Sequence, residues 1–103
     1  MEYAAVILTG AAQQLQKLFN LPDAQSINNL QQLEQMVAQA VLYLLCIDLS
    51  RLLNILYRID VEEQQVKKAM LAPTEEEVAG QIARLIIKRE LQKAQTRFIY
   101  RNN

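Results

Sequence analysis

The chain has 103 residues, with 11 basic and 11 acidic side chains and a formal net charge of zero. A neutral chain of this length predicts one domain and excludes a general electrostatic attraction to nucleic acid or to an anionic membrane. Hydrophobic residues make up 51% of the sequence, whereas glycine and proline occur twice each. This composition favours helices with a sizeable core, so we expect one all-α domain over residues 1–103.

Missing residue types exclude several kinds of chemistry. The sequence has no histidine and a single cysteine, Cys46, which excludes histidine-based catalysis, His/Cys zinc sites and internal disulfides. Cys46 lies in the apolar run 40–47, so we expect a small core residue. The first residues do not resemble a secretory signal, and polar residues interrupt every window of roughly 20 residues, the length needed to span a membrane. The sequence predicts a cytoplasmic protein without membrane segments.

Apolar residues recur at helical spacing, and breakers divide the chain into predicted helices. The first predicted helix covers about residues 3–19 and ends before Pro22. The second follows an N-cap at Ser26, or at Asp23 if it starts earlier, and covers about residues 27–58, without glycine or proline. At 1.5 Å per residue it would be roughly 48 Å long, whereas a compact domain of this size has a radius of gyration of about 13 Å.

Two capping-box spacings predict the remaining helices. Asp60, three residues before a glutamate, predicts a short helix over about residues 61–71. Thr74, again three residues before a glutamate, predicts a long C-terminal helix over about residues 75–100. The expected fold is therefore a four-helix, bundle-like domain with one long central helix and a long C-terminal helix.

The early part of the long central helix carries a narrow apolar stripe. Its members are Leu30, Leu33, Val37, Val41 and Leu44. Because a rod of this length overhangs a compact monomer, we expect the stripe to be a dimer face that pairs with its copy about a two-fold axis. A bend near residues 48–51 is the alternative, since it would fold the two halves into a compact monomer.

A polar stripe crosses the later, apolar part of the same helix. Its members are Asp48, Arg51, Asn54 and Arg58. Polar groups amid apolar surface need partners or water. Arg51 and Arg58 could form an anion or carboxylate pocket, because guanidinium groups bind such ligands through two donors. The favoured interpretation is an ion-pair network that fixes helix register, with Asp48 paired to Arg51, and Arg58 to Glu62 or Glu63.

A basic row runs along the predicted C-terminal helix. Its members are Arg89, Lys93, Arg97 and Arg101, at intervals of four residues. The row lies opposite the apolar positions Ile87 and Leu91, so we expect exposed cations that could bind a phosphate backbone. Basic residues near a helix C-terminus also interact favourably with the helix dipole, which explains the row without a ligand.

No catalytic, cofactor or metal site is predicted. The clustered glutamates lie in the first turns of predicted helices, where capping and the helix dipole account for them. The hydroxyl side chains have no histidine base. We therefore expect a non-enzymatic helical protein that self-associates as a homodimer and interacts with another protein. The alternative is a small dimeric nucleic-acid-binding protein that uses the basic row.

Overall fold

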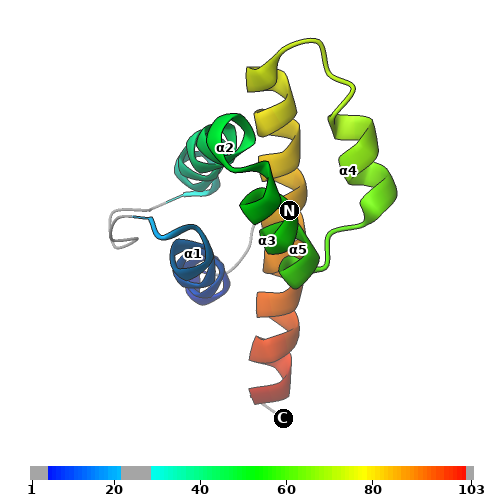
Figure 1. The fold of residues 1–103 in the computed structure, drawn as a ribbon. Helices are drawn as coiled ribbons and strands as arrows, with labels where there is room; N and C mark the ends of the chain where they lie inside the picture. Colours follow the sequence, from blue (N-terminus) through cyan, green and yellow to red (C-terminus); the bar gives the residue numbers. More distant parts are fainter. Residues whose placement is uncertain (1–4, 22–28, 102–103) are drawn as a thin grey trace.

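The computed structural model describes residues 5–21 and 29–101, and within these ranges the chain forms five helices and no strand (Figure 1). The prediction of an all-α fold is confirmed. The helices are α1 (Ala5–Phe19), α2 (Leu30–Ile47), α3 (Leu49–Ile59), α4 (Glu63–Ala69) and α5 (Glu75–Arg101).

The predicted single helix over residues 27–58 is wrong, because α2 and α3 meet at Asp48. The backbone of Asp48 is non-helical, with φ −154° and ψ 73°, and its N–H donates to the carbonyl oxygen of Leu44 at 2.8 Å. Its side-chain Oδ1 accepts a hydrogen bond from the backbone N–H of Arg51 at 3.1 Å. One aspartate therefore ends α2 and caps α3, since its carboxylate competes with the helix for backbone donors. The chain adopts the bend.

Side-chain caps also decide where α2 and α5 begin. The Oδ1 of Asn29 accepts a hydrogen bond from the backbone N–H of Gln32 at 2.9 Å, so α2 begins later than predicted. The predicted cap, Ser26, lies outside the described residues. The Oγ of Thr74 accepts from the backbone N–H of Glu77 at 3.1 Å, which confirms the predicted start of α5.

Asp60 does not start a helix as predicted. It lies in the left-handed region, with φ 69° and ψ 49°, and its N–H donates to carbonyl oxygens at the end of α3. Aspartate is one of the few residue types that tolerates this conformation. The N-cap of α4 is Glu62, which makes no side-chain capping bond, and α4 is shorter than the predicted helix over residues 61–71.

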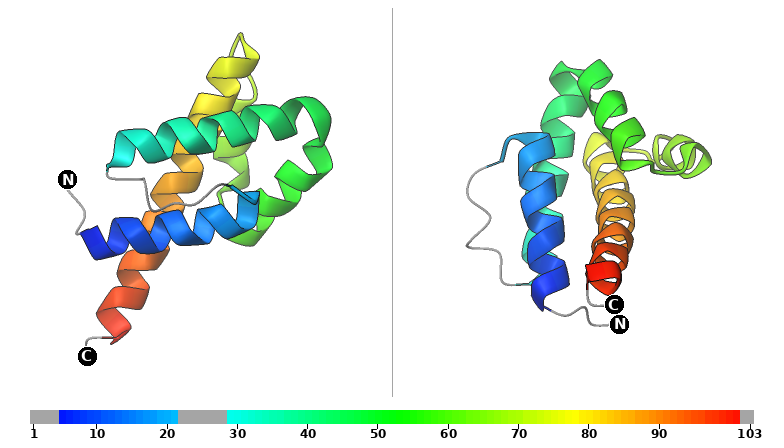
Figure 2. Two further views of the ribbon diagram at one scale, coloured as in Figure 1. Left: turned by 90° about the vertical axis from the view of Figure 1, so that its left-hand side faces the viewer. Right: turned by 90° about the horizontal axis from the view of Figure 1, so that it is seen from below.

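The helices cross one another instead of aligning in the expected bundle. In Figure 2, α1 and α2 lie side by side, run in the same direction and cross α5, the longest helix. α3 turns back from the end of α2 and packs on α2 and α5, while α4 packs on α5. The Cα radius of gyration is 13.4 Å, close to the value of about 13 Å for a compact chain of about 100 residues.

The core lies where α1, α2 and α3 meet the first two thirds of α5. The large side chains under 2% exposed include Leu15 from α1, Leu33 from α2, Leu52 from α3 and Ile82 and Ile86 from α5. Because each of the four longer helices contributes such a residue, they share one apolar core. In the described ranges, no helix combines the length and the apolar character that a membrane-spanning helix needs.

Candidate functional site

The predicted dimer face is buried inside the chain. Of its five residues, Leu33, Val37, Val41 and Leu44 are between 0% and 6% exposed. Only Leu30, at 37%, keeps substantial contact with solvent. α1 and α5 pack on α2 and cover the stripe, which is therefore not available to a second copy. Self-association through this stripe would require the core to open.

The polar stripe is exposed and does not form one site. Asp48, Arg51, Asn54 and Arg58 are all exposed. Asp48 binds the backbone N–H of Arg51 and not its guanidinium. Among the described residues the ion pairs are Lys67–Glu63, Arg89–Asp60 and Arg97–Glu90, so the predicted network is absent there. Arg51 and Arg58 line two different pockets and do not form a shared anion site.

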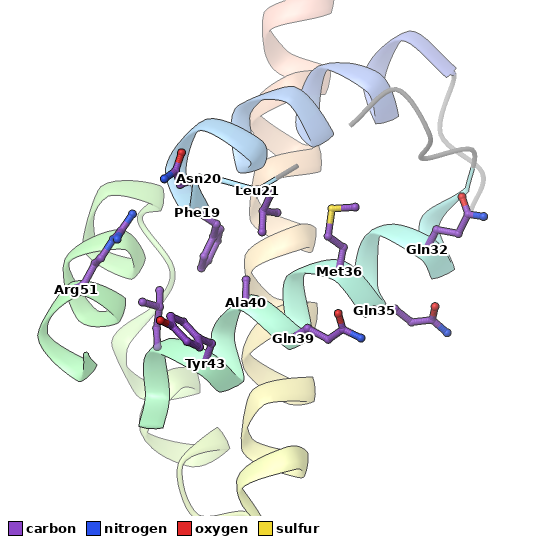
Figure 3. A pocket seen from close by; sticks show the side chains of 11 residues that line it. Phe19, Asn20, Leu21, Gln32, Gln35, Met36, Gln39, Ala40, Tyr43 and Arg51 are labelled. Atoms are coloured by element: carbon purple, nitrogen blue, oxygen red, sulfur yellow. The ribbon is translucent and has the colours of Figure 1, made fainter. Parts of the chain in front are cut away.

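Arg51 lies at one end of a groove between α1, α2 and α3 (Figure 3). The groove has a volume of about 630 Å³ and runs between the end of α1, the face of α2 from Gln32 to Leu44, and Arg51 of α3. Apolar side chains, among them Phe19 and Met36, and the amide side chains of Asn20, Gln32, Gln35 and Gln39 line the groove. Its lining includes one cation, Arg51, and no carboxylate, thiol or lysine, and its one titratable hydroxyl is that of Tyr43.

Two of the four cations in the basic row of α5 are paired within the chain. The guanidinium of Arg89 donates to the carbonyl oxygen of Asp60 at 3.2 Å and to its Oδ2 at 3.3 Å. The Nη2 of Arg97 donates to Glu90 Oε1, also at 3.3 Å. Lys93 is half-buried, and the side chain of Arg101 lies outside what the structure describes. Contrary to expectation, the row is not a continuous line of exposed, free cations.

Two of these cations meet Arg58 in a smaller pocket, here called the Glu90 pocket. It has a volume of about 170 Å³ and is lined by Gln14 and Leu18 of α1, Arg58 and Ile59 of α3, and Glu90, Lys93 and Arg97 of α5. Glu90 is 2% exposed and is the one buried charged residue in the described part of the chain. Its carboxylate thus lies at the junction of three helices.

Glu90 is the site residue that sequence reasoning missed. A signal for its burial was present, because Glu90 follows the core residues Ile82 and Ile86 at intervals of four, and these positions share one helix face. Its role was obscured because it is the one acid in a basic segment and resembles a surface counter-charge. The position of Arg58 beside it depends on how α3 and α5 pack, whereas Arg97 follows Glu90 by seven residues on α5 itself.

Cys46 is exposed, although the sequence predicted a core residue. Its thiol donates a hydrogen bond to Glu75 Oε2 at 3.3 Å, which links the end of α2 to the start of α5. This hydrogen bond, with desolvation and the charges of Glu75 and Glu76, raises the pKa of the Cys46 thiol. A raised pKa lowers the thiolate fraction at neutral pH, and the thiolate is the nucleophilic form of cysteine.

An exposed apolar row, here called the α3 row, lies on one flank of α3. Its residues are Leu49, Leu53 and Tyr57, spaced four apart, with exposures of 45%, 47% and 84%. The core-facing side of the same helix is made of other residues, Leu52, Ile55, Leu56 and Ile59. The apolar surface of α3 is therefore wider than its neighbours cover.

Comparison with known proteins gives no relative: no protein-family model, curated protein or solved structure matches the chain. Across the described ranges, histidine, cysteine and acidic side chains do not gather in groups of three that could hold a metal ion. The candidate functional surfaces are the Figure 3 groove, the Glu90 pocket and the α3 row.

Proposed function

We propose that this chain is a non-enzymatic protein-interaction protein that self-associates through the α3 row. The observation that carries the proposal is the row itself, in which Leu49, Leu53 and Tyr57 lie on one flank of a well-packed helix and remain 45% to 84% exposed. Contiguous exposed apolar surface of this kind is typical of protein interaction sites. The raised pKa of the Cys46 thiol and the absence of histidine support a non-catalytic role.

A second copy of the chain fits the row geometrically. In an antiparallel pairing about a two-fold axis, Leu53 lies opposite its own copy, and Leu49 lies opposite Tyr57. Of the polar residues that border the row, Ser50 and Asn54 are uncharged and Arg58 is basic, and this pairing places Arg58 opposite the acidic Asp48 of the second copy. Self-pairing therefore brings apolar side chains together without placing like charges in contact.

The size of the row sets the strength of the expected dimer. A stable interface buries about 800 Å² on each partner. Three side chains on an 11-residue helix supply only part of that area. We therefore expect a weak, concentration-dependent dimer.

The test is the molar mass in solution, measured by light scattering and sedimentation over a wide concentration range. The wild-type chain should move from monomer to dimer as concentration rises, and Leu53→Glu should remain monomeric. Leu71→Glu is the matched control, because Leu71 is an exposed apolar residue, at 83%, outside α3. A wild-type chain that stays monomeric, or equal dimerisation of the wild type and Leu53→Glu, would refute the proposal.

A further inference from the structure

The Glu90 pocket has the size of a small inorganic ligand. Its volume of about 170 Å³ is below the ~300 Å³ at which typical pockets for organic ligands begin. A water molecule occupies about 30 Å³ in the liquid, so the pocket has room for a tetrahedral oxyanion and several waters. The wall is formed by three separate helices, which makes the pocket a product of the folded chain.

The charges in this pocket do not balance. Glu90 contributes one negative charge and accepts a hydrogen bond from Arg97 Nη2 at 3.3 Å. Arg58 and Lys93 line the same pocket, and no ion pair of either is found in the described ranges. The residues that line the pocket therefore include one carboxylate and three cations, an excess of two positive charges.

The pocket holds more positive charge than is needed to neutralise the buried carboxylate of Glu90. A buried carboxylate needs a partner, and Arg97 supplies one. The additional cations repel each other and Arg97, and this repulsion lowers stability unless an anion or water screens it. A guanidinium offers two parallel donors to an oxyanion, and an ammonium offers a compact charge. The arrangement is complementary to one small, multiply charged oxyanion.

We propose that the Glu90 pocket binds a single small oxyanion of phosphate chemistry, held by Arg58, Lys93 and Arg97 beside the buried carboxylate of Glu90. Arg58 belongs to α3, and Lys93 and Arg97 belong to α5. A bound anion would therefore link these two helices. Glu90 orients Arg97 and, through its own charge, weakens the anion site.

A nucleic-acid backbone fits these observations less well. A strand of phosphates needs cations spaced along an open surface. Here the cations converge on one concave pocket, and Arg89, the first residue of the basic row, is held by Asp60 outside it. The geometry favours one anion over a row of them.

The experiment is a titration with inorganic phosphate at constant ionic strength, with chloride as the compensating salt. Binding is measured by isothermal titration calorimetry and by the rise in melting temperature, since a ligand that binds only the folded state stabilises it. We expect saturable binding in the millimolar range. Arg58→Gln and Lys93→Gln should each weaken phosphate binding by about tenfold, because each removes one charge from a partly solvated site. Arg51→Gln, which lies in the Figure 3 groove, and Lys88→Gln are matched controls that should bind like the wild type.

The variant Glu90→Gln best separates an electrostatic role of Glu90 in anion binding from a purely structural role. The substitution keeps the shape of the side chain and removes the repulsive charge, so phosphate should bind about fivefold to tenfold more tightly even though the variant unfolds at a lower temperature. A purely structural role of Glu90 would lower stability without raising phosphate affinity. If the variant does not fold, Arg58→Gln and Lys93→Gln still decide the proposal, since both side chains are at least partly exposed.

Three results would overturn the proposal. The first is stabilisation by phosphate that equals the effect of chloride. The second is identical phosphate affinity in the wild type, Arg58→Gln and Lys93→Gln. The third is tight binding of a short oligonucleotide without measurable binding of free phosphate, which would favour a nucleic-acid-binding face.

Discussion

The helices α2 and α3 come from one segment without glycine or proline, yet they bury their apolar residues differently. α2 packs against α1, α3 and α5, and its stripe from Leu33 to Leu44 is buried. α3 packs mainly on α2 and α5, and its outer flank keeps the α3 row exposed. The comparison teaches that the neighbours of each helix, and not its apolar content alone, decide which apolar surface remains free for a partner.

Truncating a leucine in each helix gives the largest expected difference. Leu33 of α2 is 0% exposed and Leu53 of α3 is 47% exposed. Leu33→Ala should lower the free energy of unfolding by about 2–5 kcal/mol, because it leaves a cavity in the core. Leu53→Ala should cost less than about 1 kcal/mol. Urea denaturation at low protein concentration measures both, and similar losses for the two variants would contradict the burial difference.

Removing the cap at the bend tests what separates the two helices. Asp48→Ala deletes the acceptor for the backbone N–H of Arg51 and should lower the free energy of unfolding by about 0.5–2 kcal/mol. Asp48→Asn is the matched control, because asparagine is an equally good N-cap and should keep most of the stability. If Asp48→Ala unfolds at the same urea concentration as the wild type, tertiary packing alone sets the bend.

Removing the contact at the C-terminal end of α3 should lower the free energy of unfolding less than removing the cap at Asp48. Arg89→Ala removes the ion pair and the backbone hydrogen bond to Asp60, which connect the end of α3 to α5. Because Asp60 is largely exposed, the expected loss is about 0.2–1 kcal/mol and should shrink at high salt. Lys88→Ala, at an exposed neighbouring position, should change stability less, and an equal loss in both variants would count against the Asp60 contact.

The chemical reactivity of Cys46 is the smallest of the expected effects and reports on the end of α2. Glu75 raises the thiol pKa mainly through their hydrogen bond, so Glu75→Gln should lower that pKa and increase the thiolate fraction at mildly alkaline pH. Alkylation by iodoacetamide should then be faster, and the difference should vanish at pH values above both thiol pKa values. Glu76→Gln should change the rate less, because Glu76 acts only through its charge. Equal rates in the wild type and Glu75→Gln would refute the contact.

Local signals predicted those features that depend on neighbouring residues in the sequence. The helical period indicated the all-α fold, and Thr74 indicated the start of α5, since a cap bonds to a backbone group three residues away. The same logic failed at Asp60, whose left-handed backbone ends α3 and whose carboxylate pairs with Arg89 of α5. The competing partner was distant in the sequence and therefore invisible to a local pattern.

The sequence by itself determined the helical character of the chain, the long α5 and the absence of histidine chemistry. Only the tertiary structure decided that the α2 stripe belongs to the core, that the α3 row remains exposed, and that Arg58 joins Lys93 and Arg97 around Glu90. The physical reason is that burial and charge pairing depend on distances between helices. Helical periodicity reveals which residues share a face but not which other helix covers that face.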